Sequence, residues 1–215
     1  TLITDAITAY STDSLEQFEQ VFRYSPFTTL IDEVDPAILS NITTIKISKT
    51  FKPTLASALK YTINFSNALY NPHSGHAAST TGTIAGGILS STGFTITGDS
   101  NTYYLEDDGV GIVNAYYISG SSKVYLTTGA VGTIDYTTGD IVLTKINIAS
   151  VGQVNAADST SIRLTVVPSS NDIVPVRNQI LEIDTVNLSV TGAADTIASG
   201  AGDAGVNYST TSSYS

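Results

Sequence analysis

Residues 132–143 read GTIDYTTGDIVL and predict a β-hairpin. Two short apolar strands flank a polar turn that contains Gly139. Glycine can take the positive φ that tight hairpin turns require. Ile134 and Tyr136 fall together on one face of the first strand. The stretch holds no catalytic side chain, so we expect its role to be structural.

Short strands of the same kind continue on both sides of this hairpin. Turn residues separate them at regular intervals, which is typical of a small antiparallel sheet or sandwich. The predicted strands are 94–97, 103–105, 111–118, 123–127, 133–136 and 141–148.

The N-terminal region has helical periodicity instead. Apolar residues recur at helical spacing over residues 2–10. Asp13 is followed three residues on by a glutamate, as in the capping box of a second helix. Ser25 and Pro26 have the residue types that begin a third helix. Pro36 disfavours helical geometry in the residue before it, so this helix is expected to stop nearby.

Period-two alternation marks four further segments, 43–51, 59–66, 161–167 and 185–190. We expect these strands to form one mainly antiparallel sheet, packed by the three N-terminal helices. The strands around the hairpin would then be an inserted small all-β subdomain. The predicted fold class is therefore α+β. Residues 173–183 fit either a short helix or an extended connection.

The predicted domain organisation has four parts. Residues 1–67 hold the helices and the first two core strands, 68–150 the inserted β-rich subdomain behind a long leading loop, and 151–190 the remaining core strands. A loop this long usually marks a domain junction or a binding arm. Residues 191–215 are mostly Gly, Ala, Ser and Thr, which is typical of an extended C-terminal arm.

Composition excludes several classes of partner. The chain has 215 residues, a formal net charge of −10 and only nine lysines and arginines. Nucleic-acid binding depends on cations that neutralise phosphates, so we expect no nucleic-acid partner. No apolar run approaches the ~20 residues of a membrane span, so we expect no membrane partner. The chain has no cysteine, so disulfides and thiolate metal sites are impossible.

Glu106, Asp107, Asp108 and Gly109 form the densest acidic cluster of the sequence. Such carboxylates could seat Ca²⁺, which takes several oxygen ligands. The cluster lacks the spaced ligands and the distal glutamate of a calcium loop, whereas Asp and Gly are favoured in turns at strand ends. The turn is the favoured interpretation, and we assign no metal ligand.

His73 and His76 are the only histidines. Their spacing would let both reach one metal ion, but no third ligand is evident nearby, and the segment is typical of a surface loop. A nucleophilic triad would have to recruit one of them, and no Gly-x-Ser-x-Gly elbow accompanies them. An esterase or a glycosidase is therefore disfavoured.

Two other groups resemble functional motifs without matching them. Asp32, Glu33 and Asp35 lie at a predicted helix end and are interpreted as solvated carboxylates rather than as a catalytic dyad. Residues 82–87 are rich in glycine but lack the Lys and Ser/Thr of a P-loop. We therefore predict no catalytic, cofactor-binding or metal-binding residue, and no enzyme activity.

Two tyrosine pairs, Tyr103 with Tyr104 and Tyr116 with Tyr117, place one ring on each face of a strand. One ring of each pair is expected in the core. The other is either an ordinary exposed tyrosine or an interface anchor.

Four blocks, taken together in this order, resemble the baseplate J-like proteins. The blocks are SPFTTLIDEVDPAILSN (25–41), LEDDG (105–109), GTIDYTTG (132–139) and RNQILEID (177–184). The resemblance extends over roughly residues 5–190. Within this family, the chain is similar to the C-terminal part of the baseplate wedge protein of T-even-like contractile-tailed bacteriophages. Phe27 stands where leucine is common in that family.

The resemblance implies a structural protein of the virion, located in the tail baseplate and assembled in the host cytoplasm. Family members pair as homodimers, contact other baseplate wedge proteins and link wedges into a ring around the hub, which rearranges when the tail contracts. A different hypothesis fits the tyrosine-rich strands and polar loops, namely a carbohydrate- or receptor-binding β module of a phage fibre or surface protein. Neither hypothesis requires a cofactor.

Overall fold

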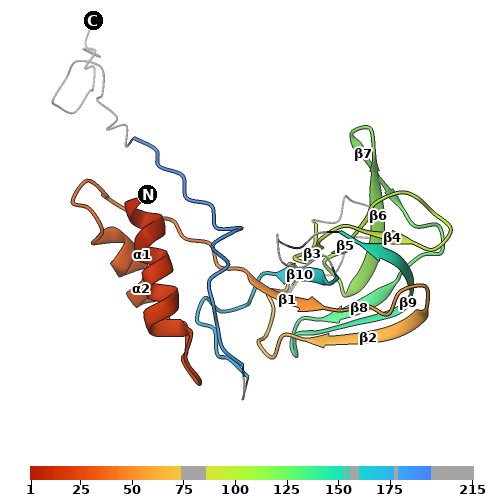
Figure 1. Cartoon of the computed structure of the whole chain (residues 1–215), viewed down its shortest axis with the longest axis horizontal. Coiled ribbons are helices and arrows are strands. Elements are labelled where there is room, and N and C mark those ends of the chain that lie inside the picture. The colour runs from red at the N-terminus through yellow and green to blue at the C-terminus, as the bar shows by residue number, and fades with distance from the viewer. Residues whose placement is uncertain (74–85, 153, 155–159, 177–178, 195–215) are drawn as a thin grey trace, which may run out of the picture.

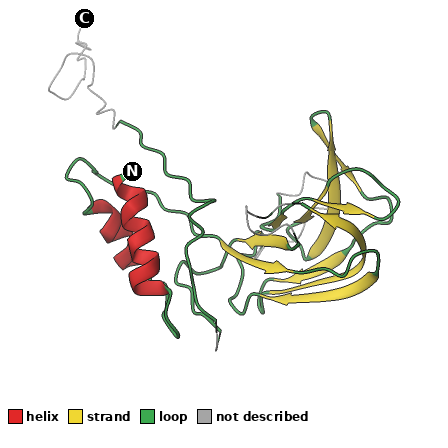
Figure 2. Cartoon of the chain, viewed as in Figure 1, coloured by secondary structure: helices red, strands yellow, loops and turns green. Residues whose placement is uncertain are grey.

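The computed structural model describes residues 1–73, 86–152, 154, 160–176 and 179–194. Figure 1 shows the helices at one end of the molecule and the strands at the other. Figure 2 shows that loops and extended segments, rather than sheet, lie between the two ends. None of the described helices is long and apolar enough to cross a membrane.

Helix α1 (Leu2–Tyr10) confirms the predicted first helix. A short π-helix, Ser11–Leu15, follows, and the backbone leaves helical geometry at Glu16. The predicted second helix is therefore wrong. The hydroxyl of Ser11, which is buried, donates to Glu16 Oε1 at 3.0 Å and accepts the backbone N–H of Ile183 at 2.9 Å. Glu16, expected in the capping box of a second helix, thus binds Ser11, and Ser11 in turn binds the distant residue Ile183.

Helix α2 (Tyr24–Asp32) begins before the predicted cap Ser25. Its first N–H, that of Tyr24, donates to Asp172 Oδ1 at 2.9 Å. Arg23 also forms a 2.9 Å ion pair with the Asp172 carboxylate. The helix start is therefore satisfied by a side chain from far along the chain instead of by its own serine.

The two helices share a small apolar cluster with an extended segment from late in the chain. The rings of Tyr10 and Phe22 both contact Phe27, with centroids 5.3 and 5.1 Å apart, respectively. Phe22 also pairs with Ile173 through a single antiparallel bridge. We call α1, the π-helix, α2 and residues 173–176 and 179–190 the helical unit. Its buried apolar residues are Ile7, Leu15, Phe22, Phe27, Ile31 and Ile173.

The other end of the molecule is a closed barrel with two additional strands. Neighbouring strands pair in the order β9, β4, β5, β6 and β8. Strand β8 then pairs with β9, which closes the barrel. Strand β2 extends the sheet beyond β9, and β7 extends it beyond β6. The strands are β2 (Ala58–Asn64), β4 (Phe94–Ile96), β5 (Tyr103–Asp107), β6 (Ile112–Ser119), β7 (Ser122–Tyr125), β8 (Gly132–Asp135) and β9 (Asp140–Val151).

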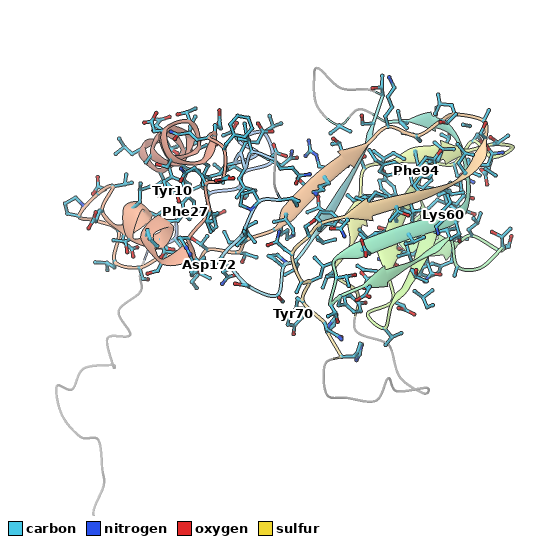
Figure 3. All side chains as sticks on the ribbon, turned by 90° about the horizontal axis from the view of Figure 1, so that it is seen from below. Tyr10, Phe27, Lys60, Tyr70, Phe94 and Asp172 are labelled. Atoms are coloured by element: carbon cyan, nitrogen blue, oxygen red, sulfur yellow. The ribbon has the colours of Figure 1, made fainter. Side chains whose placement is uncertain are left out.

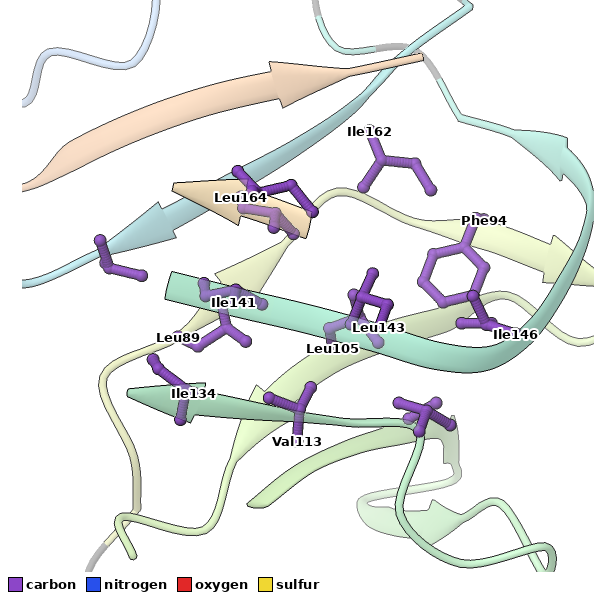
Figure 4. Packing of buried hydrophobic residues seen from close by; sticks show 14 of the residues in the cluster. Leu89, Phe94, Leu105, Val113, Ile134, Ile141, Leu143, Ile146, Ile162 and Leu164 are labelled. Atoms are coloured by element: carbon purple, nitrogen blue, oxygen red, sulfur yellow. The ribbon is translucent and has the colours of Figure 1, made fainter. Parts of the chain in front are cut away.

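A second, three-stranded antiparallel sheet packs against the barrel. Its order is β1 (Ile47–Phe51), β10 (Ile162–Val166) and β3 (Ser90–Ser91). Apolar side chains of β10 belong to the same core as those of the barrel, and Figure 4 shows Ile162 and Leu164 beside Phe94 and the β9 residues. Burial of this apolar surface is the main stabilising contribution to the fold.

The predicted fold class, α+β with helices packed on a sheet, is wrong. The protein is mostly β, and its two short helices pack on each other and on an extended segment rather than on a sheet. Of the four strands expected to share a sheet, β1 and β10 do pair, but β2 belongs to the barrel. Residues 185–190 form no strand. Alternation of apolar and polar residues identifies the buried face of a strand but not the strand that pairs with it. The predicted pairing of β2 with β1 and β10 is wrong for this reason.

Candidate functional site

The hairpin and the acidic cluster meet at one buried carboxylate. Asp107 is 2% exposed and accepts hydrogen bonds from the Tyr136 hydroxyl at 2.6 Å and from the backbone N–H groups of Leu89 and Gly109 at 2.7 and 3.2 Å. Its own carbonyl accepts from the N–H of Gly87 at 3.1 Å. Both carboxylate oxygens are thus hydrogen-bonded, as a buried carboxylate requires.

The predicted hairpin is confirmed, with Ile134 opposite Ile141 in β8 and β9. Tyr136 follows β8 and is buried on the same face as Ile134. Burial and then the hydrogen bond to Asp107 raise the pKa of Tyr136. The hydroxyl therefore remains a hydrogen-bond donor to Asp107 across the physiological pH range.

The hairpin turn also positions the segment that follows β2. Gly139 has a φ of 76°, and a Cβ at this position would lie 2.4 Å from the carbonyl oxygen of Asn67. The carbonyl of Gly139 accepts the N–H of Phe65 at 2.8 Å. Both the positive φ and the close backbone approach require glycine here.

The three acidic side chains of the cluster point in different directions. Asp107 points into the core, whereas Glu106 lies on the outer face and accepts hydrogen bonds from Lys123 and Tyr125. Asp108 Oδ1 accepts the N–H groups that follow it in the connection to β6. In the described part of the chain, no three His, Cys, Asp or Glu side chains are placed to hold a metal ion.

The predicted histidine and glycine motifs lie mostly outside the described residues. His73 N–H donates to Asn71 Oδ1 at 3.0 Å in a turn, whereas His76 is not among the described residues. Of residues 82–87, only the last two are described. A Cβ on Gly87 would lie 1.9 Å from Asp107 Oδ1, so glycine lets the backbone pass close to this carboxylate.

The carboxylates at the end of α2 lie at the surface of the protein. Asp32 and Glu33 are exposed, and Asp35 Oδ1 accepts the backbone N–H of Ala37 at 2.8 Å. Asp32 Oδ1 accepts the Asn41 side-chain amide at 2.7 Å, which links the middle of the SPFTTLIDEVDPAILSN block to its last residue. The arrangement ties the loop after α2 to the helix.

One hollow of about 670 Å³ lies beside the hairpin. Ligand pockets are enclosed, largely apolar and lined by a few convergent polar groups. This hollow instead opens widely to solvent, and the Asp135 carboxylate on its wall accepts the backbone N–H groups of Thr137 and Thr138. Those two bonds lower the pKa of Asp135. The Asp135 carboxylate thus serves the turn itself.

The structure confirms that one ring of each tyrosine pair faces the core. Tyr103 is 2% exposed and contacts Tyr117, with ring centroids 5.4 Å apart, on the core side of β5 and β6. The Tyr103 hydroxyl donates to Asp99, and burial followed by that bond raises the pKa of Tyr103 to about 12. Tyr104 and Tyr116 lie on the opposite face, with centroids 5.9 Å apart.

Three tertiary contacts were not anticipated from the sequence. Asp172 binds the start of α2, as described above and visible in Figure 3. Arg163 of β10 forms a 2.8 Å ion pair with Asp184, and Asn67 exchanges two hydrogen bonds with the backbone of Val174. The last two contacts join the helical unit to β10 and to the segment that follows β2. Asp184 ends the RNQILEID block, which is the only signal in the sequence that could have marked it.

A comparison with known protein families found a match, which covers the N-terminal part of the chain. Residues 1–50 match the family model described as "Baseplate structural protein gp6, C-terminal domain III". No curated protein matches the chain. The match supports a structural component of a phage baseplate, which implies a location in the virion tail, contact with other baseplate proteins and a non-enzymatic role. It does not extend to the baseplate J-like family in particular.

Proposed function

We propose that this chain is a self-associating baseplate wedge component of a contractile-tailed phage, which links neighbouring wedges into a ring around the hub. The observation that carries the proposal is the coincidence of two features in residues 1–50. This region matches a baseplate structural domain, and it leaves large apolar side chains in solvent. Leu39 is 74% exposed and Ile42 is 99% exposed.

Exposed apolar residues also occur in the late segments of the helical unit. Val174 is 54% exposed in an extended segment, and Val186 is 74% exposed in a turn. Single exposed apolar residues are ordinary, but these four side chains, each more than half exposed, favour a surface that another protein covers. A homodimer would cover the same patch on both copies.

The distribution of charge also supports self-association. Residues 1–35 carry seven acidic residues and one arginine, whereas residues 36–98 carry four lysines and no acidic residue. Among the described residues, none of the four lysines forms an ion pair. A second copy could place its acidic N-terminal segment against them, and a two-fold arrangement would make that contact twice. The lysines are Lys46, Lys49, Lys52 and Lys60.

A charge-swap experiment tests both self-association and the proposed charged contact between copies. Light scattering measures the oligomeric state at low ionic strength, where surface charges are least screened. One variant carries Lys46→Glu, Lys52→Glu and Lys60→Glu. The other carries Asp13→Lys, Glu19→Lys and Glu33→Lys; all six positions are exposed. We expect the wild-type chain to dimerise, each variant to be monomeric, and an equimolar mixture of the two to dimerise again.

The results of this experiment distinguish self-association from the charged contact. A monomeric wild-type chain at high concentration would remove self-association from the proposed function. Dimers of the wild type and of both variants would retain self-association but exclude the charged contact. Ring linkage is tested separately, by imaging baseplates assembled with wild-type chain and with the variant that fails to dimerise.

A further inference from the structure

Three tyrosines form a continuous row on the outer face of the barrel. Tyr104 of β5 lies opposite Tyr116 of β6, which lies opposite Tyr125 of β7. The ring centroids are 5.9 and 6.1 Å apart along the row. We call these three residues the tyrosine row. Their rings lie on the opposite face from the core, because the alternate residues Leu105 and Ala115 are buried.

Charged and polar side chains hold the rings in place. Tyr125 donates a 2.6 Å hydrogen bond to Glu106, whose other carboxylate oxygen forms an ion pair with Lys123. The Lys123 ammonium lies 4.4 Å from the centroid of the Tyr116 ring, within range of a cation–π interaction. Asn114 lies opposite Glu106 on the neighbouring strand. The row is therefore ordered before any ligand binds, which lowers the entropic cost of binding.

The core does not need these rings. Cross-strand aromatic pairs stabilise a sheet, but the barrel interior is already filled from the opposite face of the same strands. Tyr125 is 50% exposed, and Ile118, which lies opposite Lys123 on β6, is 51% exposed. In Figure 1 the β6–β7 hairpin that carries them projects from the barrel. Tyr104 and Tyr116 are half-buried, so the row is an outer-face strip whose β7 end is the most exposed.

The chemistry of this face selects one class of ligand. Tyrosine rings offer flat apolar surfaces with a polar edge, and the side chains of Glu106, Lys123 and Asn114 supply both donors and acceptors for hydroxyl groups. Glu106 neutralises Lys123, and the chain has a net charge of −10, so an anionic polymer finds no cationic track. A protein hot spot would require a well-packed apolar pocket, whereas these rings alternate with charged and amide groups.

We propose that the outer face of β5, β6 and β7 binds an uncharged oligosaccharide, with the tyrosine row stacking on successive sugar rings. The face is open rather than enclosed, so it takes several sugar units in a line instead of burying one. Affinity for a single copy is modest, and several copies in one assembly raise the overall affinity for a polymer. The proposal does not depend on the dimer or on the ring.

The test is a titration of the full chain with neutral hexasaccharides, namely cellohexaose, maltohexaose and chitohexaose, followed by NMR of backbone amides. Binding of at least one of them should shift amides of β5, β6 and β7. Tyr116→Ala should weaken that binding about tenfold or more, as removal of a central aromatic contact does, whereas Tyr116→Phe should retain most of it. Tyr70→Ala is the matched control, because Tyr70 is 53% exposed and lies outside β5, β6 and β7, where its backbone N–H donates to Val167.

Urea unfolding of each variant shows whether a loss of binding reflects loss of the barrel. Binding of none of the three hexasaccharides would overturn the proposal. Equal weakening by Tyr70→Ala and Tyr116→Ala would also overturn it, because the contact would then be unspecific. A twelve-residue thymidine oligonucleotide is the anionic probe, and tighter binding of this probe than of any hexasaccharide would assign the face to single-stranded nucleic acid instead.

Discussion

The barrel and the helical unit reach their stability in different ways. The barrel, together with β10, buries its apolar side chains almost completely, and Val113, Ile141, Leu143 and Ile148 are fully buried (Figure 4). The helical unit has only six buried apolar residues. It depends on polar contacts between distant segments, such as Asp172 with the start of α2. The barrel therefore has the larger apolar core, whereas the helical unit has a smaller core and leaves apolar side chains exposed, which favours contact with a partner protein.

The contacts between the two regions are few. Ile47 packs against both apolar clusters, and Arg163 pairs with Asp184 across the junction. Few buried contacts imply a lower local stability, so the helical unit should open more readily than the barrel. The predictions below test this difference with matched substitutions in both regions.

The largest effect is expected from removing leucine side chains in the two cores. Leu143 is 0% exposed in the barrel, and Leu15 is 2% exposed in the helical unit. Leu143→Ala should reduce the free energy of unfolding by about 3–5 kcal/mol, because the surrounding strands cannot close the cavity. Leu15→Ala should cost nearer 2–3 kcal/mol, because short helices and an extended segment can shift. Urea unfolding followed by circular dichroism measures both, and equal losses would contradict the contrast.

The next effect tests the buried carboxylate of the barrel. Asp107→Ala leaves the Tyr136 hydroxyl and two backbone N–H groups without their acceptor. We expect a total loss of about 1–3 kcal/mol, because a buried donor is left without its acceptor. Asp108→Ala is the control, since its two hydrogen-bonded N–H groups lie near the surface and can bind water. If both variants lose the same stability, burial of Asp107 is not the cause. Thermal unfolding at neutral pH gives the comparison.

The smallest effect is a pH dependence in the helical unit. Hydrogen bonds from Tyr24 and Arg23 lower the pKa of Asp172 below its ordinary value of 3.8. The carboxylate therefore contributes stability above that ordinary value, and the contribution is lost as the pH falls through the lowered pKa of the folded state. Asp172→Asn should destabilise the helical unit at neutral pH and make no difference at the acid end.

Hydrogen exchange of α2 amides measures the Asp172 effect directly. Asp135→Asn is the control in the barrel, because the pKa of Asp135 is lowered in the same direction. It should leave exchange in α2 unchanged. An Asp172→Asn variant whose α2 amides exchange like the wild type at neutral pH would show that this cap does not stabilise the helix.

Local features were predictable where neighbouring residues alone decide them. Alternation and a glycine turn suffice for the hairpin, and adjacent residues in an extended chain must face opposite ways, which separates Tyr103 from Tyr104. The helix over residues 2–10 is equally local. Asp107 was grouped with its acidic neighbours because spacing does not reveal that it points inward while Glu106 points outward to Lys123.

Pairings over long distances could not be predicted in the same way. Strands β1 and β2 alternate similarly, but one pairs with β10 and the other with β9. Residues 185–190 alternate as well, yet they form no strand, and Leu188 packs against the helical cluster instead. Alternation shows that one face is buried and leaves open whether a sheet or a helix covers it.

The sequence by itself determined the hairpin at Gly139, the first helix and the alternating faces of the strands, since these depend on backbone sterics and on side-chain spacing within a few residues. Tertiary structure alone decided that the strands close into a barrel, that Asp172 caps α2 and that Tyr136 meets Asp107. Those outcomes depend on which distant surfaces can be buried together with every polar group hydrogen-bonded, and that condition applies only to the folded chain as a whole.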